Sequence, residues 1–293
     1  MEYCLSNDCL RVKINSYGAQ LMSLYRKDVQ KEFLWQGDPV SWADRALLLF
    51  PACSRIAGNR IIVGGQEYFM PVQGFAKNME FEPLEIKPDC ITLELKSNET
   101  TLAMFPYQFR LQIRFTLQED KLIQKFIVIN DGTGDMSFSL GAHPGFFCPV
   151  DIHENTSDYV LEFDRPQHIY RFETEDVTKL LLHQKKSFIE GTEIQLSDSF
   201  FSDGPKLLGG IDADWIRLQS KKSDCGVQVG IKDFTYMALW GLAQRMTFIC
   251  LEPWCGTSDF VDTDHVWETK IGNEHLEAGG KWMRQLEYCV VTK

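Results

Sequence analysis

The chain has 293 residues, of which 44% are hydrophobic, so it can bury a large core without disulfides or metal ions to support it. Its formal net charge of -11 argues against nucleic-acid or anionic-membrane partners, which require clustered positive charge. No apolar run approaches the ~20 residues of a membrane helix, and the first residues include no apolar signal-type segment. We therefore expect a cytoplasmic protein that binds a small neutral ligand.

No linker, charge block or low-complexity tract divides the sequence, so we expect a single domain over residues 1–293. The nine cysteines are odd in number and irregularly spaced, without a CxxC pair or a histidine at zinc-finger distance. This pattern predicts reduced, mostly buried thiols, no metal site and no cofactor. Cys250 and Cys255 lie around a candidate motif, where a buried thiol acting as a small hydrophobe is one interpretation and a reactive thiol the other.

Alternation of apolar and polar residues with a period of two predicts half-buried strands along the chain. The clearest examples lie at 10–14, 91–95 and 109–115, and shorter ones at 122–129, 136–140, 215–218 and 227–231. Turn sequences at 63–65 and 130–132 separate neighbouring strands.

Helical patterns are scarce. Residues 44–49 and 176–182 each predict a short helix, but neither is long enough for the crossover of a repeating βαβ unit. No repeat of roughly 20 to 50 residues indicates a propeller or solenoid. The chain is therefore expected to be all-β, a large antiparallel sandwich with few short helices, although strand pattern alone would also allow a closed barrel.

Among six histidines, only His143 has an informative setting. It follows a predicted strand within Gly141-Ala142-His143-Pro144-Gly145-Phe146, where glycine permits close backbone approach and proline fixes the exit of the chain. A catalytic histidine is one interpretation, and a turn histidine bonded to local backbone is the other. The remaining histidines lie among polar or charged residues and are expected at the surface.

A second feature is Glu252, at the end of the apolar run Phe248-Ile249-Cys250-Leu251 and before Pro253-Trp254. Burying an ionised glutamate is costly unless it is paired or hydrogen-bonded. Glu252 therefore needs a partner or a raised pKa that suits proton transfer, and a structural salt bridge is the alternative to catalysis.

The segments around these two residues resemble the signature segments of the aldose 1-epimerase family, in its LacX-like branch. The stretches around Arg55, at 74–81 and at 236–240 also resemble that branch, in the same order. The resemblance implies a twisted antiparallel β-sandwich of the galactose mutarotase-like type. It also implies interconversion of the α and β anomers of a hexose or related sugar without a cofactor.

In the mechanism that the resemblance implies, Glu252 is the general base for the anomeric hydroxyl and His143 is the general acid for the ring oxygen. His143 is expected near its ordinary pKa and Glu252 ionised, so that no large pKa shift is needed. Arg55 matches the family's sugar-binding arginine, with a salt bridge as the alternative. Trp240 and Trp254 either offer flat faces to the sugar or belong to the core.

Three positions depart from the family pattern. Gln73 stands before Gly-Phe where the family usually has a histidine, and an amide cannot carry a proton in acid-base catalysis. Asp203 lies where the family has an acidic segment that contacts sugar hydroxyls, but the following Gly204-Pro205 loosens the match. Ser54 replaces a glycine that commonly precedes the arginine.

Two functions remain on this evidence, an active mutarotase and a carbohydrate-binding or regulatory relative that Gln73 has made inefficient. An epimerase of sugar phosphates lacks support, because no Arg/Lys cluster or Gly-rich phosphate loop adjoins the motifs. The sequence does not determine which sugar is bound or the oligomeric state.

Overall fold

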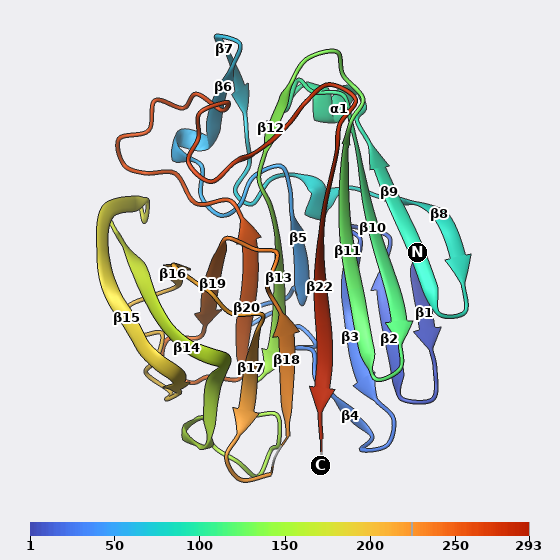
Figure 1. The fold of residues 1–293 in the computed structure, drawn as a ribbon, viewed down its shortest axis with the longest axis vertical. Coiled ribbons are helices and arrows are strands. Elements are labelled where there is room, and N and C mark those ends of the chain that lie inside the picture. Colours follow the sequence, from blue (N-terminus) through green and yellow to red (C-terminus); the bar gives the residue numbers. More distant parts are fainter. Residues whose placement is uncertain (224, 293) are drawn as a thin grey trace.

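The computed structural model describes residues 1–223 and 225–292, and strands make up most of the fold (Figure 1). The N-terminal strands form a sheet of four in chain order: β1 (Glu2–Ser6), β2 (Leu10–Asn15), β3 (Gln20–Arg26) and β4 (Lys31–Glu32). A second sheet of 14 strands contains most of the remaining chain.

The large sheet is antiparallel and open, with β5 and β8 as its end strands. In spatial order it consists of β5 (Ala46–Leu49), β13 (Leu140–Phe147), β20 (Phe248–Cys255), β19 (Tyr236–Gly241), β16 (Lys206–Gly209), β14 (Tyr159–Thr174), β17 (Trp215–Ser220), β18 (Gly226–Gly230), β22 (Lys281–Val291), β11 (Lys121–Asn130), β10 (Phe109–Gln118), β9 (Cys90–Lys96) and β8 (Glu82–Lys87), and β15 (Leu181–Gln195) pairs with β14. This arrangement confirms the predicted sandwich and rules out the closed barrel.

The remaining elements are small. Two-stranded ribbons join β12 (Met136–Phe138) to β21 (Glu274–Leu276) and β6 (Arg60–Val63) to β7 (Gln66–Phe69). The helical turns are α1 (Glu99–Leu102) and the 3₁₀ turns η1 (Ala57–Asn59), η2 (Ala76–Asn78) and η3 (Thr156–Asp158). No helix within 1–223 and 225–292 has the length and apolar character needed to cross a membrane.

Period-two patterning predicts the strands well. On β10, Leu111, Ile113 and Phe115 are buried, whereas the intervening Gln112 and Arg114 are partly exposed. The other predicted strand runs are also confirmed, and residues 136–140 divide between β12 and the start of β13. Alternation therefore identifies the strands and, on β10, the face that is buried.

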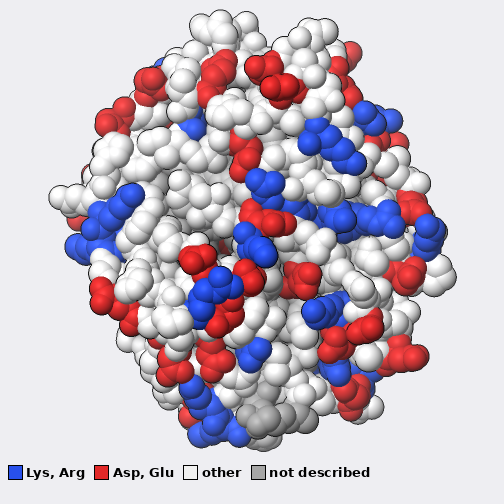
Figure 2. All heavy atoms as spheres, in the orientation of Figure 1, with Lys and Arg blue, Asp and Glu red and all other residues white. Residues whose placement is uncertain are grey.

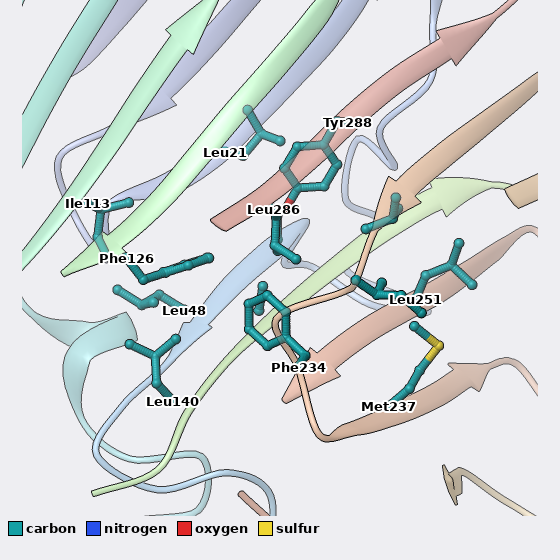
Figure 3. Close-up of a cluster of buried hydrophobic side chains, with 14 of the residues drawn as sticks. Leu21, Leu48, Ile113, Phe126, Leu140, Phe234, Met237, Leu251, Leu286 and Tyr288 are labelled. Carbon is teal, nitrogen blue, oxygen red and sulfur yellow. The ribbon is translucent and has the colours of Figure 1, made fainter. Parts of the chain in front are cut away.

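The core lies between the two sheets. In Figure 3, Leu21 of β3 converges with Ile113 of β10 and Tyr288 of β22. The same core extends to Leu140 of β13 and Leu251 of β20. Burying these side chains fixes β13 and β20 against the rest of the protein, and each fully buried aliphatic side chain contributes about 1.5–3 kcal/mol.

The helix expected at 44–49 is wrong, because Ala46–Leu49 is strand β5 and pairs with β13. Leu48 faces the main core, whereas Leu47 and Leu49 belong to a separate apolar cluster on the other face of the sheet. A strand that is buried on both faces is apolar throughout, so its sequence lacks the alternation that distinguishes a strand from a helix.

The helix expected at 176–182 is also wrong. Residues 175–180 form a turn, and Leu181 already begins β15. The Glu175 carboxylate accepts hydrogen bonds from the backbone and hydroxyl of Thr178, and Lys179 adopts a left-handed φ of 58°. Local side-chain bonds of this kind compete with helical hydrogen bonds and favour a turn.

On the face shown in Figure 2, basic and acidic side chains are interspersed. Ion pairs also join strands of the large sheet, between Lys121 of β11 and Glu287 of the adjacent β22, and between Arg114 of β10 and Glu85 of β8. Paired charges of this kind make the outer face of the sheet hydrophilic, but each exposed ion pair contributes little to folding stability.

Candidate active site

The pairing of β13 with β20 brings a histidine against a glutamate. Gly141 lies opposite Trp254 and Gly145 opposite Cys250, which places His143 across from Glu252. His143 Nε2 and Glu252 Oε2 are 3.4 Å apart. The side chains are only 7% and 2% exposed, so the pair is almost completely withdrawn from water.

The two glycines of the histidine segment make room for this arrangement. Gly141 and Gly145 lie two residues either side of His143 and therefore on the same face of β13. A Cβ on Gly141 would lie 2.4 Å from Trp254 Cδ1, and one on Gly145 would lie 2.6 Å from Trp42 Cζ3. Only glycine at these positions lets both indoles lie against the strand beside the histidine.

Aromatic rings hold the His143 imidazole in place. Trp42 stacks on it with ring centroids 5.0 Å apart, and Trp240 meets it edge-on at 5.7 Å. Within the described residues, His143 Nδ1 and Trp254 Nε1 are buried without a hydrogen-bond partner. Each of these atoms is a polar group that a bound molecule could satisfy.

These groups line a cleft of about 360 Å³, a volume that suits a small-molecule ligand. Its lining is formed by Trp42, Asp44, Leu47, Ser54, Arg55, Val72, Gln73, Lys77, His143, Pro205, Ala238, Trp240, Glu252 and Trp254. Six of the seven site residues expected from the sequence are therefore brought together, although they come from segments far apart in the chain.

Two loops carry Arg55 and Gln73 into the cleft. The backbone N–H of Gln73 donates a hydrogen bond of 2.8 Å to the carbonyl of Ser54, which ties the loops together. Ser54 has a left-handed φ of 56°, a conformation that favours glycine, and its hydroxyl accepts a hydrogen bond from Ser258. Serine thus adopts the left-handed conformation that would suit a glycine at this position, and Arg55 still lines the cleft.

Asp203 is the expected site residue that does not line the cleft. Its carboxylate is engaged by Arg171 and Lys206, while Pro205, two residues later, reaches the cleft. Although burial opposes ionisation, hydrogen bonds from Lys206 and Arg171 lower the pKa of Asp203 to about 2. Its hydrogen-bonding capacity is already directed toward these two cations.

Sequence reasoning missed Trp42 and Lys77 as members of the site. Lys77 lies on η2, four residues after Gln73, within a segment that resembles the family but to which no role was assigned. Trp42 precedes β5, which the sequence pattern had presented as a helix. A histidine flanked by glycines at i-2 and i+2 could have indicated that bulky side chains pack beside it.

Burial shifts both members of the central pair toward their neutral forms. Desolvation lowers the pKa of His143 to about 4, and the positive charge of Lys77 adds to this shift. Desolvation also raises the pKa of Glu252 well above its ordinary value. The expectation of an ordinary histidine pKa beside an ionised glutamate is therefore wrong, because it took no account of burial.

Comparison with known proteins gives matches along nearly the whole chain. A family model described as aldose 1-epimerase matches residues 1–271. The plasmid and chromosomal forms of Protein LacX from Lactococcus lactis subsp. lactis are 33% and 32% identical to it over 274 residues, with 91% of this chain and 91% of each relative covered.

Two solved structures are also similar. A galactose mutarotase related enzyme from Lactobacillus acidophilus has a TM-score of 0.94 at 27% identity and covers 100% of both chains. A galactose mutarotase-like protein from Lactobacillus casei ATCC 334 has a TM-score of 0.93 at 26% identity, covering 99% of this chain and 100% of that one.

The lowered pKa of His143 can be tested directly. We expect the His143 imidazole to stay neutral as the pH is lowered from 7 to about 5, because the buried ring has no water to solvate its charge. NMR of ¹⁵N-histidine-labelled protein reports its protonation, with His143→Gln to assign the signal and the exposed His153 as reference on the same spectra. A His143 signal that titrates at the ordinary value of 6.5 would contradict this prediction.

Proposed function

Because the chain belongs to the aldose 1-epimerase family of isomerases, we propose that it interconverts the α and β anomers of a hexose or related sugar by acid-base ring opening. The observation that carries this proposal is the approach of His143 Nε2 to within 3.4 Å of Glu252 Oε2 at the floor of a sugar-sized cleft. The ring oxygen and the anomeric hydroxyl share one carbon atom, so their acid and base must stand close together.

The proposed reaction moves two protons. Glu252, as general base, takes the proton of the anomeric hydroxyl while His143, as general acid, gives a proton to the ring oxygen. The bond between the anomeric carbon and the ring oxygen breaks, and the open-chain aldehyde forms. Rotation about C1–C2 and reversal of both transfers then close the other anomer and restore the pair.

Burial affects where this cycle begins. Because burial favours the neutral form of both groups, we assign the transferable proton of the pair to Glu252 at the start of the cycle. Its transfer across the 3.4 Å to His143 Nε2 produces the carboxylate and imidazolium that the ring-opening step uses. Ring opening returns His143 and Glu252 to their neutral forms. Burial favours these forms, so the pair is in its more stable state when the open-chain aldehyde is present.

Other residues that line the cleft can bind the sugar. Arg55 has no carboxylate within 4 Å among the described residues, so its guanidinium is available to donate hydrogen bonds to sugar hydroxyls. Gln73 can bond a hydroxyl or the ring oxygen. Trp240 and Trp254 offer apolar faces to the C–H side of the ring. We leave Asp203 out of this set because Arg171 and Lys206 already occupy its carboxylate.

A carbohydrate-binding or regulatory relative is the second candidate. Gln73 lines the cleft where the resemblance implies a histidine, and its amide has no proton to transfer. In that case, the cleft would bind a sugar without accelerating its mutarotation.

Polarimetry distinguishes the two functions. We expect the purified protein to speed the optical-rotation change of freshly dissolved α-glucose or α-galactose, in proportion to protein concentration, because an acid and a base are held together. A Glu252→Gln variant provides the matched control, since the amide retains the shape of the side chain but cannot act as a base. A rate equal to the blank for every sugar tested, with sugar binding retained, would favour the second function.

Two substitutions test the roles within the site. His143→Gln should lower the rate by ~10²–10⁴-fold, because it removes the acid, whereas Gln73→Ala should lower it by a factor of about 2 to 13, the value of one neutral hydrogen bond. Gln73→His should leave the rate unchanged or raise it. Initial rates by polarimetry and circular dichroism of each variant separate chemistry from misfolding. A near-wild-type rate in His143→Gln would remove His143 as the acid.

A further inference from the structure

A buried thiol lies beside the acid-base pair. Cys250 is two residues before Glu252 on β20, so strand alternation directs both side chains to the same face of the sheet. One donor atom from each of His143, Cys250 and Glu252 lies within 4.8 Å of the other two. All three residues are buried, and Cys250 is a free thiol.

The imidazole of this cluster is not fully hydrogen-bonded by the protein among the described residues. His143 is 6% exposed, and its Nδ1 has no hydrogen-bond partner among the described residues. Stacking against Trp42 fixes the plane of the imidazole. The β13–β20 pairing holds the three side chains on adjacent strands of one sheet, so a ligand would find them already close together.

We propose that His143, Cys250 and Glu252 form a three-ligand site for a zinc ion, whose fourth ligand enters from the cleft. Imidazole, thiolate and carboxylate are ligands that zinc accepts, whereas calcium and magnesium prefer oxygen alone. In a tetrahedral zinc site the Zn–S bond is about 2.3 Å long and the Zn–N and Zn–O bonds are about 2.0–2.2 Å long. These bond lengths place the ligand atoms roughly 3.3–3.8 Å from one another. The donor atoms, which lie within 4.8 Å of one another, need to approach by about 1–1.5 Å at most to reach this geometry.

Zinc binding to this site can be written with charge and protons in balance. The ion displaces the thiol proton of Cys250 and the carboxyl proton of Glu252 to solvent, and the neutral imidazole of His143 donates a lone pair. Two anionic ligands then neutralise the divalent ion, which is the condition for burying it. The bound ion also removes the base and the acid together, so it should inhibit the proposed mutarotation reversibly.

Spectroscopy with cobalt(II) tests the site without relying on activity. Adding cobalt(II) chloride to the reduced protein should produce a thiolate-to-cobalt charge-transfer band and tetrahedral visible bands at one equivalent, and zinc should abolish both. Cys250→Ser should remove the charge-transfer band and weaken zinc binding by more than the ~10–100-fold that outer-shell changes cost. The matched control is Cys255→Ser, a buried thiol on the same strand but on the core side, which should retain both.

Zinc affinity by calorimetry gives a second readout. Glu252→Gln should weaken binding but keep the charge-transfer band, because the thiolate remains. A wild-type protein without the band, or a band that survives in Cys250→Ser, overturns the proposal. If the protein binds zinc but has no mutarotase activity, the zinc site is supported and the proposed function is rejected. If it has mutarotase activity but does not bind zinc, the proposed function is supported and the zinc site is rejected.

Discussion

The register between β13 and β20 holds an imidazole against a carboxyl group in a place from which water is almost excluded. Such a pair is costly to bury in its ionised form, and each group lowers that cost by shifting toward neutrality. The remaining proton is the one that acid-base chemistry requires. The cleft thus gains a reactive pair that carries little net charge between reaction cycles.

The two faces of the same strands explain how that cost is offset. Leu140 of β13 and Leu251 of β20 point into the main core (Figure 3), while His143 and Glu252 point into the cleft. Core burial on one face anchors the strands and therefore fixes the distance between the polar groups on the other. A slip of one residue in either strand would exchange the faces and place these polar groups in the core.

Much of the fold and of the candidate site could be predicted from the sequence. The features that could not be predicted depend on contacts between residues far apart in the chain. Alternating strands were identifiable because polar and apolar residues alternate along them, even in β9, where both kinds are buried. β5 was not, because it is apolar on both of its buried faces. The segments around His143 and Glu252 were identifiable from their motifs. The approach of Cys250 to His143, the role of Lys77 and the shifted pKa values were not, since they arise from strand register and burial that no local segment encodes.

The same geometry makes the site vulnerable to a metal ion. The imidazole of His143 and the carboxyl group of Glu252 serve the proton transfers, and the same two groups would bind a zinc ion together with the thiolate of Cys250. Sugar and zinc would therefore compete for one set of donors, and each would reduce the apparent affinity of the other by mass action. Replacing the thiol by a residue that is a poorer ligand would relieve this competition without altering the acid or the base. The acid-base chemistry thus requires His143 and Glu252, whereas sensitivity to metal depends on the third residue of the cluster.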